Sequence, residues 1–150
     1  MMSILKNTHT KSFIAVIALV SIWINFSEVI RYFIWVMPAT KSYFPHDDRV
    51  ADMDLGIFLI WGLWDTLLTT VLVIITYLTI KVLGNSILNV VRSALLVWAT
   101  IFVIFWVASA NMGLSDWNIL WVTLPLSLIE MMVGAYFTSI LLVKFQHIKP

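Results

Sequence analysis

The sequence contains no cysteine and few charged residues. The lack of cysteine excludes disulfide bonds, thiolate metal sites and iron–sulfur clusters. The shortage of charge excludes a water-soluble domain, because charged residues make up 11% of this chain and hydrophobic residues 61%, whereas soluble domains carry roughly 25% charged residues. The formal net charge of +1 also gives no basic footprint of the kind that binds nucleic acid, so no nucleic-acid partner is expected.

Catalytic signatures are also missing. All three histidines, His9, His46 and His147, lie outside the apolar segments, which excludes haem ligation by histidine and a Ser–His or HExxH site within those segments. No glycine-rich phosphate loop and no lipidation motif is present. The sequence therefore predicts no catalytic residue, no metal site and no cofactor, and it does not predict an enzyme.

What the chain does have is apolar sequence, in stretches near residues 12–37, 55–80, 87–110 and 118–143. Each is close to the 20 or so residues that span about 30 Å of hydrocarbon. The first follows a basic start, as in a signal peptide, but it continues through Trp35 without a small-residue cleavage site, so we expect a membrane helix. The sequence predicts an all-α integral membrane protein: a single domain over residues 1–150, folded as an up-down-up-down bundle of four transmembrane helices.

Proline, glycine and capping residues mark where these helices begin and end. Pro38 is expected to end the first helix, which leaves residues 38–54 as the only long outer loop. The expected caps are Asp54 and Gly84 at the two ends of the second helix, Asn85 or Ser86 before the third, and Ser115 or Asp116 before the fourth.

Lysine and arginine fall mostly on one side of the predicted bundle. That side carries Lys6, Lys11, Lys81, Arg92, Lys144 and Lys149. The other side has only Lys41 and Arg49, in a loop rich in aspartate. By the positive-inside rule, we expect both termini to be cytoplasmic in a cell membrane of the bacterial inner-membrane type, with the acidic loop facing outward.

Ionisable residues interrupt the predicted membrane helices at Glu28, Arg31, Asp65 and Glu130. At 1.5 Å per residue, Glu28 and Asp65 lie roughly 15 Å from the outer boundary, with Arg31 roughly 10 Å and Glu130 roughly 18 Å from it. A charge at the bilayer centre costs about 2.5 to 3.5 kcal/mol. We therefore expect these side chains to meet inside the bundle, in its outer half.

Helical spacing supports the inward direction of both glutamates. Glu28 shares a polar stripe with Ser21, Asn25 and Tyr32 at spacings of 4, 3 and 4 residues. Glu130 shares a stripe of small residues with Thr123, Ser127, Gly134 and Thr138, which permits close helix approach. The third predicted helix has few polar residues and is expected to serve in packing.

The charges in this cluster do not balance. Arg31 is expected to neutralise Glu28, three residues before it, and to reach Asp65 or Glu130. Three carboxylates against one guanidinium leave two negative charges, so at least one acid must hold its proton unless a bound cation or a water-filled cavity compensates. Asn25 and Trp64 are expected to line the site, since aromatic faces beside carboxylates hold organic cations.

The sequence thus predicts a small polytopic membrane protein that binds or translocates a proton, a small cation or a polar or amine ligand from the outer side. One alternative is an accessory or assembly subunit, in which the charge network is structural and the small-residue stripe packs on a partner in a membrane complex. A second is a membrane-embedded enzyme acting on a lipid through the acidic loop, which carries His46, Asp47, Asp48, Asp52 and Asp54. The lipid bilayer is the partner common to all three. The sequence is also compatible with a homodimer, since four helices are few for enclosing a pathway, although no motif specifies its interface.

Overall fold

The computed structural model describes residues 2–47, 50, 52–145 and 147, and within them every regular element is helical, with no strand. Four helices are long and apolar enough to cross a membrane, and we refer to them as the first to fourth long helices: Thr10–Tyr43, Leu55–Leu83, Ile87–Asn111 and Trp117–Lys144. The expectation of an all-helical protein with four membrane-length helices is therefore confirmed. Of the charged residues considered above, Asp48, Arg49 and Lys149 lie outside the described residues.

Three of the long helices contain a change of helix type. The first consists of α1 (Met2–Arg31) from Thr10 onward, a π-helical turn η1 (Tyr32–Val36) and α2 (Met37–Tyr43), whereas the second is the continuous α3 (Leu55–Leu83). The third comprises α4 (Ile87–Trp98), a π-helical turn η2 (Ala99–Val103) and α5 (Ile104–Asn111). The fourth begins with a 3₁₀ turn η3 (Trp117–Ile119) and continues as α6 (Leu120–Lys144).

Pro38 does not end the first long helix, and that expectation was wrong. The N–H of Met37 donates to the carbonyl of Tyr32, five residues back, so the π-helical turn resets the hydrogen-bond register just before the proline. Pro38 then stands in the first turn of α2, where a missing N–H is tolerated. The helix continues to Tyr43, and the outer loop is correspondingly shorter than residues 38–54.

The caps expected from the sequence are present. Asp54 accepts a hydrogen bond from the N–H of Ile57 at 2.8 Å, and Asp116 accepts one from Asn118 at 2.9 Å. Ser86 is the residue that caps α4. Gly84 ends α3 with a φ of 90°, a conformation that side chains with a Cβ rarely adopt.

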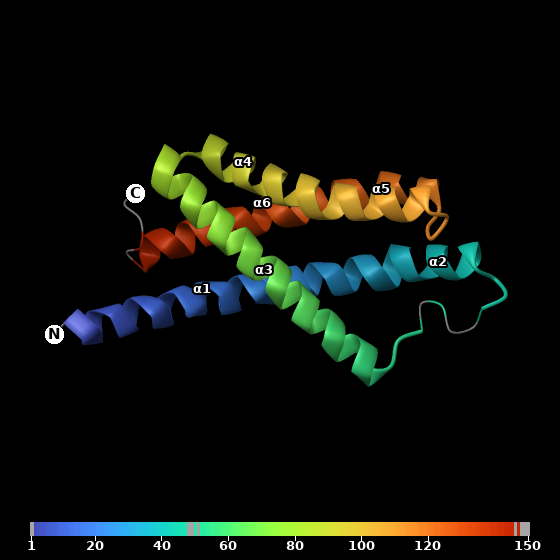
Figure 1. The fold of residues 1–150 in the computed structure, drawn as a ribbon, viewed down its shortest axis with the longest axis horizontal. Coiled ribbons are helices and arrows are strands. Elements are labelled where there is room, and N and C mark those ends of the chain that lie inside the picture. The colour runs from blue at the N-terminus through green and yellow to red at the C-terminus, as the bar shows by residue number, and fades with distance from the viewer. Residues whose placement is uncertain (1, 48–49, 51, 146, 148–150) are drawn as a thin grey trace.

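Figure 1 shows both termini at one end of the bundle, together with the turn between α3 and α4; we call this the terminus end. The opposite end, with α2, α5 and η3, is the loop end. In Figure 1, α3 crosses the other helices obliquely: it lies beside α4 at the terminus end and diverges from α5 toward the loop end. It packs against α1, α4 and α6, which places most of its contacts away from α5.

The buried apolar core is made by side chains from all four long helices, among them Val16, Val20, Leu72, Val97 and Met131. Gly134 sets the approach of α6 to this core, because a Cβ there would lie 2.8 Å from Leu72 Cδ2 and 3.1 Å from Ile24 Cδ1. Close packing therefore explains why a glycine occupies this position in the small-residue stripe.

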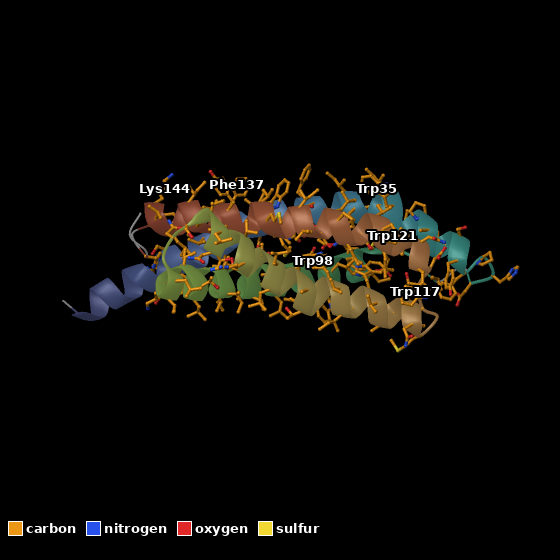
Figure 2. The ribbon with its side chains drawn as sticks, turned by 90° about the horizontal axis from the view of Figure 1, so that it is seen from above. Trp35, Trp98, Trp117, Trp121, Phe137 and Lys144 are labelled. Carbon is orange, nitrogen blue, oxygen red and sulfur yellow. The ribbon has the colours of Figure 1, made fainter. Side chains whose placement is uncertain are left out.

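Aromatic and basic side chains mark the two ends. Figure 2 shows Trp35, Trp117 and Trp121 toward the loop end and Lys144 toward the other. Trp121 is 83% exposed, so it is a surface residue and not part of the core.

Candidate functional site

Arg31, in the last turn of α1, joins three of the long helices. Its guanidinium forms an ion pair with Glu28 on the same helix. Its Nε lies 3.8 Å from Oε2 of Glu130 on α6, and its guanidinium carbon lies 5.1 Å from the ring centroid of Phe102 in η2. The side chain is only 5% exposed, so these contacts replace solvent around a buried positive charge.

Glu130 is the most buried of the three acids, at 1% exposure. Its Oε2 accepts a hydrogen bond from the hydroxyl of Ser27 at 3.0 Å, and its backbone carbonyl accepts one from Trp23 Nε1 at 3.1 Å. Its carboxyl group also lies close enough to that of Glu28 to share a hydrogen bond when one of the two is protonated.

Two polar atoms in this network have no hydrogen-bond partner among the described residues: Oε1 of Glu130 and Nε of Arg31. Buried polar atoms are normally satisfied, and leaving one unmade costs about 1 to 3 kcal/mol. The Nε–H of Arg31 can therefore still donate a hydrogen bond, and Oε1 of Glu130 can still accept one or carry a proton.

Asp65, on α3, is the fourth member of the cluster. The other members are Glu28 and Arg31 on the first long helix and Glu130 on the fourth. Asp65 is 7% exposed, and its nearest charges are those of Glu28 and Arg31. Within the described residues its carboxylate accepts no hydrogen bond; only its backbone carbonyl does, from Thr69 at 2.7 Å. Asp65 is thus a nearly buried acid whose carboxylate has no hydrogen-bond donor among the described residues.

Beside this cluster lies a cavity of about 590 Å³, within the range of roughly 300 to 1,000 Å³ usual for small-molecule sites. Its charged lining residues are Glu28, Arg31 and Asp65, and aromatic residues supply much of the rest: Tyr32, Trp61, Trp64, Phe102, Phe105 and Trp106. These side chains come from the first, second and third long helices, with the turn after α5 at the loop end. The lining shows that the cavity lies between α3 and the segment η2–α5, which diverge toward the loop end in Figure 1.

A second, much smaller cavity of about 30 Å³ shares Glu28 and Asp65 with the large one and includes Asn25 in its lining. Its volume is enough for a single water molecule. The Asn25 side chain donates to the carbonyl of Ser21 at 2.9 Å, so its amide nitrogen is used within its own helix.

The residues proposed from the sequence divide into two groups. Glu28, Arg31 and Glu130 lie in direct contact, and Asp65 joins them across the cavity floor. Trp64 lines the large cavity at its exposed rim, whereas Asn25 lines only the small one.

Sequence reasoning missed Phe102 and Ser27. The third long helix was expected only to pack against the others. In the structure, three of its aromatic residues line the cavity: Phe102, Phe105 and Trp106. Their spacings of three and one residues place them on one helical face, and this was the signal that the sequence offered. Ser27 precedes Glu28 and so lies about 100° away from its stripe, which is why the stripe did not include it.

Metal binding has no geometric support in the part of the chain that the structure describes. No three histidine, cysteine, aspartate or glutamate side chains there group closely enough to hold a metal ion. In the acidic loop, Asp54 serves as a helix cap and Asp48 lies outside the described residues.

Comparisons with known proteins give no relative: no family model, no curated protein and no solved structure matches the chain. The function must therefore be argued from the site itself.

Proposed function

We propose that this is a multi-pass membrane protein with both termini on the cytoplasmic side. Large apolar side chains are exposed on every long helix, for example Ile22 (68%), Leu63 (71%), Ile104 (63%) and Ile129 (56%). Soluble monomers rarely expose apolar surface on this scale, whereas lipid tails solvate it. Lys11, Lys81, Arg92 and Lys144 belong to helix segments at the terminus end, against Lys41 alone at the loop end among the described residues, which supports the orientation.

In this membrane, the cluster of Glu28, Arg31, Asp65 and Glu130 binds or translocates a proton, a small cation or an amine from the outer side. The observation that carries the proposal is Asp65: a 7% exposed carboxylate without a hydrogen bond among the described residues, in the wall of a cavity of about 590 Å³. A positively charged ligand in that cavity supplies the missing counter-charge.

The charge count supports the same reading. Arg31 is shared between Glu28 and Glu130, which leaves Asp65 and one further carboxyl to be neutralised. In the empty site, protons neutralise these two carboxyl groups. In the occupied site, a bound cation replaces one of the protons. Binding of a cation and protonation are therefore competing events at these acids.

The test is thermal stability of the detergent-purified protein between about pH 4 and pH 9, where carboxyl groups titrate, with and without a panel of inorganic and organic cations. The native protein should be stabilised by at least one cation, most strongly at the higher pH values, and Asp65→Asn and Glu130→Gln should lose that response. Asp54→Asn is the matched control, because asparagine preserves the cap on the same helix. If stability is flat in pH and ligand while the site variants merely lower it, the charges are structural and the proposal fails.

Neither alternative gains a specific observation. The small-residue stripe that an assembly subunit would present to a partner is buried within the chain's own bundle, with Thr123, Ser127 and Thr138 all at 0% exposure. For a lipid enzyme, the acidic loop gives no grouped metal ligands among the described residues.

A further inference from the structure

We infer that the ligand of the large cavity is an amphiphilic ammonium ion, one positive amine carrying an apolar chain, which enters from the lipid side between α3 and α5. This inference rests on the proposed function and names its ligand class and route. It is argued from the lining of the cavity, its charge and the position of its opening.

The size and lining of the cavity favour an organic cation over a bare inorganic ion. Inorganic cations require several oxygen ligands at fixed distances, and the described acids do not group in that way. The cavity of about 590 Å³ offers instead two carboxylates beside six aromatic rings: Tyr32, Trp61, Trp64, Phe102, Phe105 and Trp106. Aromatic faces next to carboxylates hold ammonium groups by cation–π attraction and charge pairing.

The sign and number of charges favour one positive charge. Of the charged residues in the lining, Glu28 and Arg31 neutralise each other as an ion pair. Asp65 is left with one negative charge and no hydrogen bond in the described residues. A ligand with a single ammonium group neutralises the charge of Asp65, whereas an anion would lie against an uncompensated carboxylate.

The rim of the cavity is apolar and faces outward between two helices. Trp64 on α3 is 66% exposed and Phe105 on α5 is 59% exposed, and both line the cavity. Trp64 lies nine residues after Leu55, the first residue of α3, which puts it roughly 14 Å from that helix end. The opening therefore extends along the flank of the bundle, at a depth where lipid chains lie.

The order of residues on α3 links the charged floor to this rim. Trp64 and Asp65 are adjacent in sequence, and adjacent helical residues point about 100° apart. Asp65 accordingly faces the interior while Trp64 stands at the edge. A ligand whose ammonium meets Asp65 extends its apolar chain past Trp64 toward the lipid.

The test uses the full-length protein in maltoside micelles, which carry no amine, and a series of probes: tetramethylammonium, octyltrimethylammonium and dodecyltrimethylammonium. Apparent affinity, from the shift in thermal unfolding, should rise by about tenfold or more from the first to the last, because each added methylene is buried against the aromatic rim. Octanol and dodecanol at equal concentration should give no matching shift, since they lack the charge.

Variants separate the two parts of the ligand. Asp65→Asn should lower the apparent affinity for all three ammonium probes by about tenfold or more, because the counter-charge is lost. Trp64→Ala should lower the apparent affinity for dodecyltrimethylammonium several-fold and leave that for tetramethylammonium nearly unchanged. Asp54→Asn and Trp121→Ala are the controls: Asp54 caps α3 away from the cavity, and Trp121 is 83% exposed and does not line it.

The source of the amine is distinguished by competition with phosphatidylethanolamine added to the micelles. Displacement of dodecyltrimethylammonium by this lipid supports an ammonium headgroup as the ligand, and binding without displacement supports a free amphiphilic amine.

The failures are also distinct. If protons or small cations stabilise the native protein but chain length and Trp64→Ala have no effect, this inference is overturned while the proposed function stands. If no cation or proton has any effect, both fail. A stable dimer that buries Trp64 in its interface would close the lateral route and overturn the inference.

Discussion

The two halves of the bundle differ in their buried charged groups. At the terminus end, each buried polar side chain named here is paired: Thr76 with Ser93 at 3.1 Å, Ser139 with Asn85 at 2.8 Å, and Asn89 with two backbone carbonyls at 2.9 Å. At the loop end, Glu130 and Arg31 each keep an unpaired atom among the described residues, and Asp65 lines a cavity. The named polar side chains at the terminus end are thus hydrogen-bonded, whereas the charged side chains at the loop end are only partly paired.

Helix geometry differs between the halves in the same way. Both π-helical turns, η1 and η2, flank the cluster: η1 follows Arg31 directly and η2 supplies Phe102, which contacts Arg31. Single π-helical turns inside α-helices occur frequently at functional sites. Substitutions in the two halves should therefore have different consequences, and the following predictions run from the largest expected effect to the smallest.

Arg31→Met should have the largest effect, because it leaves Glu28 and Glu130 buried without their shared counter-charge. We expect a loss of about 3 to 5 kcal/mol in unfolding free energy near neutral pH. The loss should shrink as pH falls, since protonation of the acids removes the charge that Arg31 balances. Chemical unfolding of native and variant protein over a range of pH measures both effects.

Arg92→Met is the matched control for Arg31. Arg92 is exposed on α4 and donates to Asn89 at 3.0 Å, so its removal should cost no more than about 1 kcal/mol and should not depend on pH. Equal losses for the two arginines would remove the distinction between the halves.

Gly134→Leu tests the packing of α6 against the first and second long helices. A side chain at this position meets the fully buried Leu72 and the first long helix, so we expect overpacking to cost about 1 to 3 kcal/mol at every pH. Gly62→Ala is the comparison, because its Cβ would have only ordinary contact, 3.7 Å from Asn25 Oδ1. Differential scanning of both variants would show whether tolerance differs as expected; an undisturbed Gly134→Leu would contradict the packing described.

Ser93→Ala should have the smallest effect, about 1 kcal/mol, through loss of the buried hydrogen bond to Thr76. Cation response should be unchanged in this variant, because the pair lies at the terminus end. Thr66→Val, which removes an exposed hydroxyl that bonds its own helix, provides the control and should lie within about 0.5 kcal/mol of native. A changed cation response in Ser93→Ala would show that the two halves are coupled.

Much of the fold follows from the sequence alone. Runs of apolar residues predicted four membrane-length helices, and Asp54, Ser86 and Gly84 predicted where helices start and stop, because capping is a local property. Pro38 misled because its effect depends on the hydrogen-bond register before it, and the register is set by the π-helical turn at Tyr32–Val36.

The candidate site could be predicted only in part. Periodicity and depth brought Glu28, Arg31, Asp65 and Glu130 to one level of the bundle, and three of them do lie in contact. The cavity could not be predicted, since it arises from the oblique course of α3 away from α5, a matter of helix packing angle that no single residue specifies. Phe102 was missed for the same reason: its role depends on which helix lies over it.

The most direct test of the surplus carboxyl is infrared spectroscopy of the protonated carboxyl band in the native protein at neutral pH, with and without dodecyltrimethylammonium. The account predicts a band from the cluster that weakens when the cation binds and that is reduced in Asp65→Asn or Glu130→Gln but not in Asp54→Asn. A band that no cation alters, or a native protein with every carboxyl ionised in the absence of a cation, would contradict it.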